Sequence, residues 1–547
     1  MSDRCGHEYL TEATALSSDQ RGQPNHTNCP HEHWDNSDYY PFHLPMDECK
    51  NHGLSDEAVR DAFLRAIESD DRARKRFREA EFGDLDLNSF VLDSGDNEPI
   101  VFEQATIHGL LNFSRASIRQ PLKFSRCTFN TVQATDAEFD YELRFPNATF
   151  HGDVDFVGSA FKRGAFFRQS TFDRPLLFGG TEFNAAASFR YATFRAVSTF
   201  RDVGFGQASF NEATFETSAQ FSAVTFRGRA EFTMTEFASS ATFEGVRALA
   251  QFDFSPNRVG RSDFSDSSFE NIDVAIGVLG GSRRVSLRDT TIETGRLGQP
   301  SSDGRVAYDL TGARLGDVTL DLPTPGAFDR YRRYLTDFGN FQFVEYREAL
   351  RDHRWKIHEY VEPTETTTTD LELTYLKAKR GASSVGDSDD AAHFFVREMR
   401  YRRRRYRERT GDPSLPVRDR LGALSRWFAN GFLALVAGYG ERPQRVIATA
   451  ISVVLTSALL YPFEWVGGVR TADGVYLYGN RPTLAAELAA FAYDNSLYFS
   501  VVTFTTLGYG DSSPAGGLAR LLASAEAVSD AFFAALFVFA LGRRVTR

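Results

Sequence analysis

The apolar positions of the chain follow different periods in different regions, and each period predicts a different structure. Between about Val101 and Phe269, large apolar residues recur at alternating spacings of five and six, so an eleven-residue unit repeats. A helix with 3.6 residues per turn cannot keep that spacing on one face, and a sheet meander requires longer alternating strands. The clearest run is Phe145, Phe150, Phe156, Phe161, Phe167, Phe172, Phe178, Phe183, Phe189, Phe194 and Phe200.

A squared parallel β-helix fits this repeat. Each segment of five or six residues forms one short side and a turn, and two eleven-residue units complete a coil. Phe would stack on Phe along the axis at roughly 4.8 Å per coil, the usual separation of strands. Small residues two places before a Phe, such as Ala192 before Phe194, would stack in the same way. We therefore predict a quadrilateral parallel β-solenoid over 101–322, after a short helical or entry segment at 56–100.

Composition supports a repeated motif, because Phe accounts for 50 of the 547 residues while Met and Trp account for 4 each. The repeat resembles the pentapeptide-repeat family in its Phe-rich variant, which implies the solenoid fold and little about function. The net charge of −11 argues against a nucleic-acid binder, so we expect no nucleic-acid partner. Some members of that family imitate DNA with an acidic rod, which keeps a binding role open.

Beyond the repeat, the pattern becomes helical over 323–411, with predicted helices near 328–358 and 369–409. The basic run Arg402–Arg405 lies in the second of these. We interpret it as a solvated face or as the inner-leaflet side of a membrane protein. An amphipathic juxtamembrane segment at 412–445 follows.

The last segment, 446–547, contains two apolar stretches, Val446–Val466 and Leu518–Leu541, that are long enough to cross a bilayer. Arg is more frequent on the flanks of this pair than between its members, which places both termini in the cytoplasm. The sequence therefore predicts a multi-pass protein of the plasma membrane, embedded in the lipid bilayer by an all-α domain of two transmembrane helices.

Between the stretches the chain runs from Asp494 to Asp511 as DNSLYFSVVTFTTLGYGD. This segment resembles the pore helix and selectivity filter of potassium channels, with the pore helix at 496–504. The filter pattern is matched by Thr506, Leu507, Gly508, Tyr509 and Gly510, although Leu507 stands where Val is common. The resemblance is to a two-transmembrane potassium channel pore domain with a re-entrant loop, fused to a pentapeptide-repeat domain. It implies K⁺ as the permeant ion and a homotetramer, because one loop supplies a quarter of a filter.

The chemistry of a filter explains these residue types. Rings of backbone carbonyls replace the water that K⁺ loses on entering the pore, and aligning them requires positive φ, which glycine tolerates. We therefore expect Gly508 and Gly510 in that conformation, and the hydroxyl of Thr506 at the inner end. Tyr509 would pack against the pore helix, and Asp511 would favour cations at the outer mouth. A second Gly-Tyr-Gly at 438–440 lies before the first stretch without a preceding Thr pair, so we interpret it as a turn.

Two carboxylates fall within the second stretch. Asp530 lies midway along it, and a lipid-facing carboxylate there is costly, so we expect it to face a water-filled cavity. Four Asp530 side chains would bind a multivalent blocker from inside and cause rectification; the alternative is a polar cavity wall without a blocker. Glu526 is one turn nearer the filter, and we expect it to brace the filter from behind.

The N-terminal segment, 1–55, is rich in Cys and His. Three thiolates and one imidazole make a closed tetrahedral Zn²⁺ site, and the best set here is Cys5, Cys29, Cys49 and His52. Other His residues of the segment could substitute, and the alternative is a His-rich tail without metal. We expect Cys127, inside the solenoid, to be a core residue.

The leading hypothesis is a potassium-selective channel that carries the solenoid as a scaffold, or as a docking surface for an unknown regulatory ligand or protein. No nucleophile elbow, P-loop or recognisable carboxylate pair is present, so we do not expect an enzyme. One alternative is a weakly selective cation channel, since Leu507 could loosen the filter. Another is a pentapeptide-repeat binding scaffold that the two spans merely anchor in the membrane.

Overall fold

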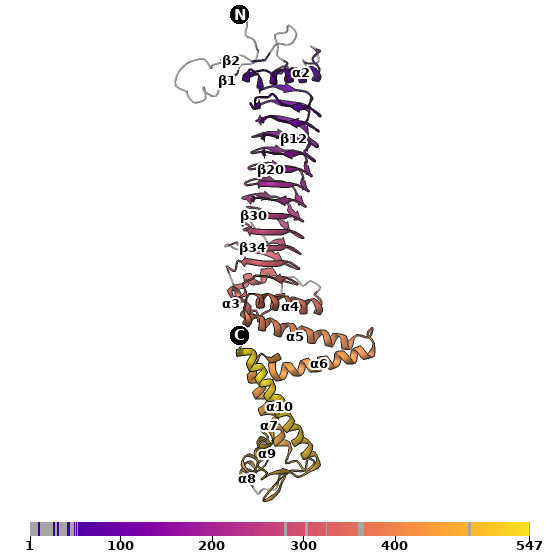
Figure 1. Cartoon of the computed structure of the whole chain (residues 1–547), viewed down its shortest axis with the longest axis vertical. Helices are drawn as coiled ribbons and strands as arrows, with labels where there is room; N and C mark the ends of the chain where they lie inside the picture. The colour runs from indigo at the N-terminus through magenta and orange to yellow at the C-terminus, as the bar shows by residue number, and fades with distance from the viewer. Residues whose placement is uncertain are drawn as a thin grey trace, which may run out of the picture. The chain divides into compact units, whose positions relative to one another are not determined.

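The computed structural model describes residues 9–10, 26–27, 30–31, 41–43, 49, 51, 53–277, 282–300, 305–323, 325–358, 366–479 and 483–545. These form two compact units, Met1–Thr364 and Glu365–Arg547. The first unit is a parallel β-solenoid and the second is mainly helical (Figure 1). The predicted fold class is thereby confirmed.

The solenoid strands belong to two sets, each paired in parallel from coil to coil. The first set contains β3 (Arg76–Arg78), β6 (Val91–Leu92), β7 (Ile100–Glu103), β9 (Ser117–Ile118), β10 (Leu122–Ser125), β12 (Glu138–Phe139), β13 (Leu143–Arg144), β16 (Ala160–Phe161), β17 (Ala165–Phe166), β20 (Glu182–Ser188), β23 (Gly204–Ser209), β26 (Thr225–Phe226), β27 (Ala230–Thr233), β30 (Arg247–Ser255), β32 (Ser268–Val274), β34 (Thr291–Leu297), β36 (Arg314–Leu320) and β38 (Asp337–Phe338). The second set contains β4 (Glu81–Phe82), β5 (Leu85–Asp86), β8 (Thr106–Asn112), β11 (Thr128–Gln133), β14 (Thr149–Phe150), β15 (Val154–Asp155), β18 (Thr171–Phe172), β19 (Leu176–Gly179), β21 (Thr193–Phe194), β22 (Ser198–Arg201), β24 (Thr214–Phe215), β25 (Ala219–Ser222), β28 (Glu236–Phe237), β29 (Ser240–Glu244), β31 (Arg261–Asp263), β33 (Ser282–Ser286), β35 (Arg305–Asp309) and β37 (Tyr331–Arg332).

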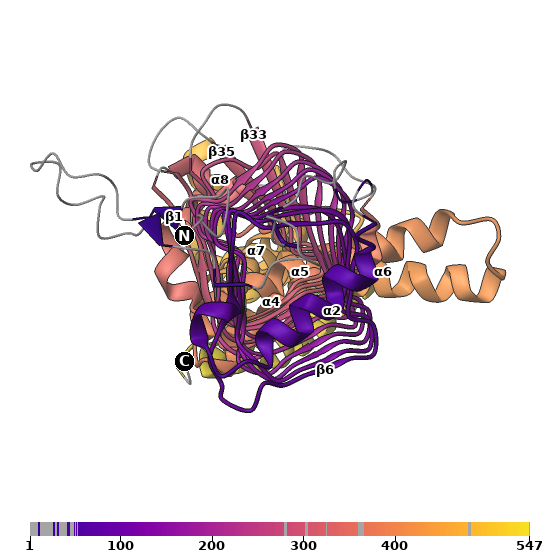
Figure 2. The ribbon, with the colours of Figure 1, turned by 90° about the horizontal axis from the view of Figure 1, so that it is seen from above.

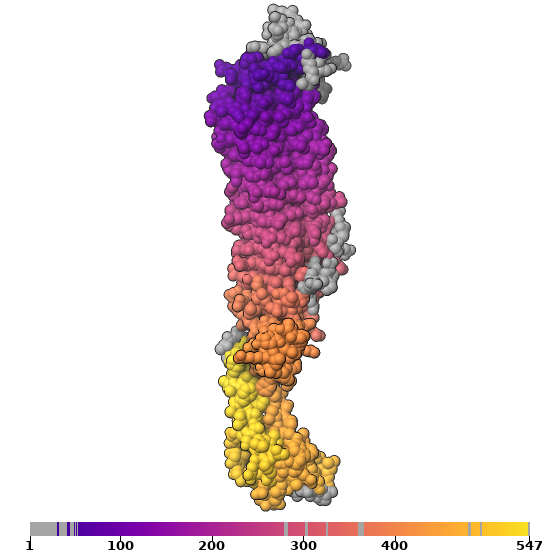
Figure 3. Space-filling view, turned by 90° about the vertical axis from the view of Figure 1, so that its right-hand side faces the viewer, coloured from indigo at the N-terminus to yellow at the C-terminus, as the bar shows by residue number. Residues whose placement is uncertain are grey.

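The register explains the Phe repeat. Phe150 pairs with Phe172, and Phe172 with Phe194, so each coil advances the chain by 22 residues at these positions. The stacked rings lie with centroids 4.7 and 5.2 Å apart and nearly parallel. Figure 2 looks down this stack and shows the coils superposed, and Figure 3 shows them in unbroken contact. Two eleven-residue units per coil, as the spacing predicts, are confirmed.

The corners of the coils repeat with the same period. Asp136, Asn147, Gly158, Gln169 and Gly180 follow one another at eleven-residue intervals, and all have φ between +56° and +71°. Glycine adopts this left-handed conformation freely, and Asn and Asp tolerate it better than most other residues. Each corner therefore turns the chain at a fixed point, which keeps the Phe side chains in register.

Some inner positions carry a hydroxyl in place of a small apolar side chain. Ser170, Thr181 and Thr235 are fully buried. Each donates a hydrogen bond to the carbonyl oxygen of the residue 25 positions earlier in the chain, at 2.5, 2.9 and 3.0 Å respectively. A buried hydroxyl without a partner would cost about 1–3 kcal/mol, so these contacts let the repeat vary without penalty.

The solenoid is longer than the Phe spacing indicates. Its strands extend from Arg76 to Phe338, and the stretch near 328–358 contains β37, β38 and only one α-helix, α3 (Arg347–Asp352). There, other apolar residues replace Phe on the stack: Tyr308 lies over Tyr331 with ring centroids 5.0 Å apart. The expectation of a largely helical segment at 328–358 is therefore wrong.

The N-terminal end of the stack is covered by helix α2 (Asp56–Ile67), whose Ser55 hydroxyl caps its first turn. Phe63 on its buried face contacts Phe77 and Phe102 of the first coils. Covering an exposed strand edge prevents pairing with other chains. The remaining short elements of this unit are β1 (Tyr9–Leu10), β2 (His26–Thr27), η2 (Arg72–Lys75), η3 (Pro325–Arg330) and η4 (Phe343–Tyr346).

The second unit opens with two helices, α4 (Thr368–Ser384) and α5 (Ser388–Gly411), joined by an ion-pair cluster. The buried carboxylate of Glu398 contacts Lys379 and Arg402, both at 2.6 Å, and Glu372 contacts Arg402 at 2.8 Å. Part of the basic run Arg402–Arg405 thus holds the two helices together, and only Arg404 of the run is exposed. The other elements are α6 (Val417–Ala437), η5 (Gly438–Gly440), α7 (Pro443–Leu460), α8 (Leu484–Ala489), the π-helical η6 (Ala490–Asp494), α9 (Ser496–Phe504), α10 (Gly517–Val545), β39 (Val469–Thr471), β40 (Gly474–Tyr476) and β41 (Ser513–Pro514).

Candidate functional site

Helices α7 and α10 are long and apolar enough to cross a membrane. Only 22 % of the apolar window of α7 and 11 % of that of α10 is buried within the protein, so neither resembles the core helix of a soluble domain. Their lengths fit a bilayer, which needs about 20 residues. This arrangement fits a membrane location.

Helix α9 lies between them and contacts both. Its inner end packs through Phe504 against Val446 of α7 and Phe533 of α10. Its outer half packs through Phe499 against Tyr461 and Ala519. The bounds of α9 are the same as those predicted for the pore helix, Ser496–Phe504.

A small antiparallel sheet closes the loop that contains α9. Strand β39, which follows α7, pairs with β41, which follows the Thr506–Asp511 segment, through Val469 and Pro514. Gly467 and Gly516 approach so closely that a Cβ on Gly467 would lie 2.5 Å from the Cα of Gly516. The chain therefore enters and leaves the loop at one place, and α9 and the segment after it form a re-entrant unit.

The segment after α9 has an alternating backbone. Thr506, Gly508 and Gly510 have φ of +53°, +55° and +81°, while Leu507 and Tyr509 between them do not have positive φ. The positive φ expected at Gly508 and Gly510 is present, and Thr506 adopts it too, which the sequence analysis did not anticipate. An alternation of this kind turns successive carbonyl groups toward one side, as a row of ion ligands requires.

The side chains of this segment are open in the single chain. Leu507 is 56 % exposed and Tyr509 is 68 % exposed. The packing of Tyr509 against the pore helix, expected for the assembled filter, stays a prediction.

Asp511 is held by a residue that the sequence analysis missed. The phenol of Tyr498, near the start of α9, donates a hydrogen bond of 2.7 Å to Oδ2 of Asp511. This contact ties the outer end of the Thr506–Asp511 segment to the helix behind it. Asp511 thus remains an acceptor at the outer end, with its carboxylate held in one orientation.

Glu526 forms the centre of a buried polar cluster behind α9. Its side chain is 2 % exposed and links α10 to α9 and to the end of α7. Oε2 accepts a hydrogen bond from the Tyr461 hydroxyl at 2.7 Å, and Oε1 accepts one from Ser500 of α9. The Ser500 hydroxyl also contacts the carbonyl oxygen of Val454 in α7 at 2.8 Å. Glu526 therefore lies where a brace on the pore helix requires it.

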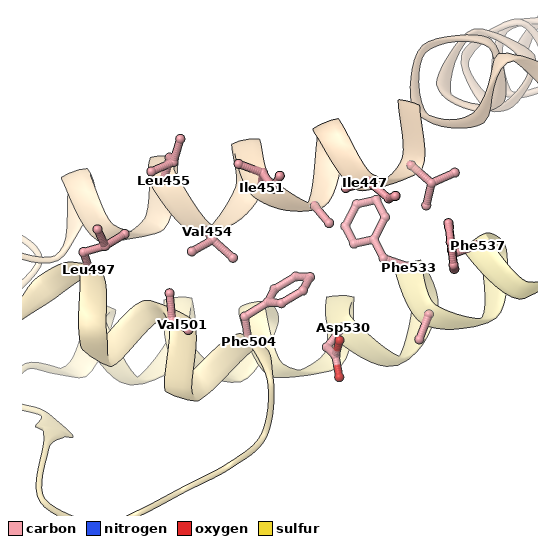
Figure 4. A pocket seen from close by; sticks show the side chains of 13 residues that line it. Ile447, Ile451, Val454, Leu455, Leu497, Val501, Phe504, Asp530, Phe533 and Phe537 are labelled. Carbon is pink, nitrogen blue, oxygen red and sulfur yellow. The ribbon is translucent and has the colours of Figure 1, made fainter. Parts of the chain in front are cut away.

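Asp530 lines a cavity of about 470 Å³ between α7, α9 and α10 (Figure 4). It is the one polar side chain among the thirteen that line the cavity, beside Phe504 and Phe533. The side chain is half-buried, and it forms no hydrogen bond or ion pair with any residue that the structure describes. In the single chain, Asp530 therefore borders an apolar hollow.

The predicted zinc ligands cannot be compared with one another. Cys5, Cys29 and His52 lie outside the described residues, and Cys49 is buried. Within the described ranges, no cluster of three or more His, Cys, Asp or Glu could hold a metal ion. His31 of the same segment is buried, with Nε2 3.0 Å from the carbonyl oxygen of Arg76. The zinc site stays a prediction. Cys127 is buried, as a core residue would be.

Comparison with known families agrees with this division of the chain. Residues 471–547, which include α9, the alternating segment and α10, match the family described as "Ion channel". Residues 145–193 match the family described as "Pentapeptide repeats (9 copies)". No curated protein and no solved structure matches the chain. The chain thus joins a pentapeptide-repeat solenoid to a C-terminal domain of the ion channel family.

Proposed function

We propose that the protein is a homotetrameric, potassium-selective channel of the plasma membrane, with both termini in the cytoplasm. The observation that carries the proposal is the alternating positive φ at Thr506, Gly508 and Gly510, directly after a buried helix between two apolar spans. The ion channel family match over 471–547 covers α9, this segment and α10. We assign the protein no enzymatic activity.

The selectivity follows from the carbonyl groups of that segment. A dehydrated K⁺ ion needs oxygen ligands on all sides, and four copies of the segment around one axis would supply them. Helix α9 ends at Phe504, directly before the segment, so its negative end favours a cation there. Asp511, held by Tyr498, adds a carboxylate at the other end. A single chain supplies one wall of such a pore, which is why the proposal requires four.

The orientation follows from charge. Arg442 and Arg445 lie at the start of α7, and Arg543 and Arg544 lie at the end of α10. The two ends are adjacent, because Arg543 forms an ion pair of 2.9 Å with Glu441. Basic residues at this end of both spans favour its placement on the cytoplasmic side. The solenoid, which precedes α7, would then be a cytoplasmic scaffold or a docking surface for a regulatory ligand or protein.

The test is K⁺ flux from liposomes reconstituted with the purified full-length protein. We expect flux that barium blocks and that falls steeply when sodium replaces potassium. Gly508→Ala and Gly510→Ala should abolish it, because an Ala side chain disfavours the left-handed backbone. Gly479→Ala is the matched control: Gly479 has φ of +86° and, like the two filter glycines, no atom within 4 Å of an added Cβ, but it lies outside the filter.

The alternatives give different results in the same assay. Equal sodium and potassium flux that Gly508→Ala still abolishes would indicate a weakly selective cation channel. This alternative is tested because Leu507 stands where Val is common in the filter pattern. Absence of flux from a well-folded protein, including a variant with a widened cavity, would indicate an anchored scaffold. Loss of flux in Gly479→Ala as well would contradict the role given to the filter glycines.

A further inference from the structure

Four arginines surround a cavity of about 280 Å³ at one end of the membrane-spanning pair. Arg400 and Arg403 come from α5, and Arg442 and Arg445 come from the start of α7. The remaining lining residues include Ala434, at the end of α6, and Tyr439 of η5. We refer to this site, with these four arginines, as the arginine pocket.

The arginine pocket carries uncompensated charge. Within the described ranges, none of its four arginines forms an ion pair, whereas Arg402 and Arg405 on the same helix pair with Glu372. The nearby carboxylate of Glu441 is engaged by Arg543. Burial, with a smaller contribution from neighbouring arginines, lowers the pKa of Arg400. Side chains that repel one another and lack a counter-charge indicate a site for an anion from outside the chain.

The guanidinium groups are also held in position. Arg403 lies over the ring of Trp427, 5.2 Å from its centroid, and directly over Gly431. A Cβ on Gly431 would lie 2.8 Å from Nη2 of Arg403, so a larger residue there would displace the guanidinium. Arg445 donates a hydrogen bond of 3.2 Å from Nη1 to the carbonyl oxygen of Ala434. These contacts fix two of the four cations without neutralising them.

The backbone adds two further features. Gly438, Tyr439 and Gly440 all have positive φ, which turns the chain sharply between α6 and α7. The turn is anchored by the Tyr439 hydroxyl, which donates a hydrogen bond of 2.9 Å to Oδ1 of the buried Asn430. Helix α7 then begins without a side-chain cap, so no side chain takes up the amide groups of its first turn. The N-terminus of a helix attracts anions through such groups.

We propose that the arginine pocket binds an anion that carries phosphate groups. Arginine forms paired hydrogen bonds with phosphate oxygens, and four of them exceed what a single carboxylate requires. The volume lies just below the usual range for ligand sites, which suits a phosphorylated headgroup or a small soluble phosphate. Both sources are compatible with its position, because α7 is a membrane span and α6 exposes Phe428, Phe432 and Leu435 beside it.

The test compares two double variants of the full-length protein. Arg400→Gln with Arg442→Gln removes two pocket charges, and Arg407→Gln with Arg418→Gln removes two exposed charges of α5 and α6 outside the pocket. In nanodiscs of phosphatidylcholine, inorganic pyrophosphate is titrated by calorimetry. In detergent, phosphatidic acid binding is counted by native mass spectrometry against phosphatidylcholine. We expect the pocket variant to lose about tenfold or more in affinity, and the control variant less than about twofold.

The two probes distinguish the sources. Pocket-dependent binding of pyrophosphate supports a soluble phosphate, and pocket-dependent binding of phosphatidic acid alone supports a lipid headgroup. Binding of neither probe, or an equal loss in both double variants, overturns the proposal.

A second variant guards against misfolding of the first. Arg403→Lys keeps the charge but loses the paired donors, so we expect it to fold and to bind several-fold more weakly. Undiminished binding in Arg403→Lys and in Arg400→Gln would also overturn the proposal. Because the pocket arginines repel one another, Arg400→Gln should raise the melting temperature of the ligand-free protein, which loss of a structural contact would not do.

Discussion

The solenoid and the segment that contains α7, α9 and α10, called the pore segment below, both contain many large apolar side chains, but bury them to different extents. In the solenoid, Phe side chains such as Phe172 and Phe189 are fully buried within the chain. In the pore segment, Ile447, Ile451 and Leu455 of α7 are about half exposed. The solenoid therefore completes its core within one chain, whereas the pore segment leaves apolar faces for lipid or for other copies of the protein.

The buried polar groups of the two regions also differ in which parts of the chain they join. In the solenoid, a hydroxyl such as that of Thr181 satisfies a carbonyl of the neighbouring coil, and several other coils contain a similar contact. In the pore segment, Glu526 holds Tyr461 and Ser500, which come from separate helices. Stability is thus spread along the solenoid, while the arrangement of the pore helices depends on a few residues.

The largest effect is expected from a cavity in the solenoid. Phe189 stacks between Phe167 and Phe210, with centroid distances of 5.0 and 4.9 Å. Phe189→Ala should cost about 3–5 kcal/mol, because the rigid stack above and below cannot collapse into the space. The loss is measured by denaturant unfolding of the full-length protein, followed by the β signal in circular dichroism.

Val197→Ala, eight residues away and 40 % exposed, is the control and should change the unfolding free energy by less than about 0.5 kcal/mol. An equal loss in both variants would show that the stack is not where the stability of the solenoid lies. Flux should survive Phe189→Ala wherever the protein stays folded, since no filter residue is altered.

The next effect concerns the brace behind the pore helix. Glu526→Ala removes the acceptor of the Tyr461 hydroxyl and leaves that group buried without a partner, at a cost of about 1–3 kcal/mol. We expect a lower melting temperature of the assembled protein and a loss of potassium over sodium selectivity. Glu526→Gln, which keeps an acceptor of the same shape, should lose less of both.

Ser524→Ala is the matched control, because Ser524 is exposed on the same helix and contacts only the carbonyl of Arg520 among the described residues. Selectivity that survives Glu526→Ala unchanged would mean that the cluster stabilises the helices without positioning the filter.

The solenoid could be predicted because its eleven-residue Phe motif recurs many times along the chain. One misplaced Phe in such a series changes little, and the spacing of 22 residues between Phe150 and Phe172 fixes the coil by itself. The predicted solenoid ended at 322 and so missed the last strands, where Tyr331 stacks on Tyr308 and the Phe spacing is lost. The stack continues there on the same geometry with different side chains.

The site could be predicted only as far as backbone conformation and sequence order determine it. Gly508 and Gly510 reveal their positive φ because glycine is the residue that tolerates it. The contact from Tyr498 to Asp511 could not be found in this way, because it joins a helix to a loop 13 residues later. The arginine pocket was hidden for a similar reason, since the run Arg402–Arg405 mixes one pocket residue, Arg403, with arginines that pair with Glu372.

Asp530 on α10 is the position where the expected binding of a multivalent blocker can be tested. If four carboxylates from α10 face a common pore, Asp530→Asn should weaken block by internal Mg²⁺ or polyamine about tenfold and straighten the current–voltage curve. The measurement is the current of single reconstituted channels with and without the blocker on the cytoplasmic side. Curves that are the same for the two proteins would leave Asp530 as a polar wall residue without a blocker.

The smallest effect is expected at the outer end of the filter. Tyr498→Phe removes the hydroxyl that donates the hydrogen bond of 2.7 Å to Asp511 and keeps the aromatic ring. Because the carboxylate is near solvent and water can replace the donor, the loss of stability should be small. We expect flux to persist, with faster inactivation or a few-fold weaker selectivity, since Asp511 loses its fixed orientation. Asp511→Asn in the Tyr498→Phe background should add little if the two residues act through this contact. Fully additive effects would mean that Tyr498 and Asp511 shape the outer end of the filter independently.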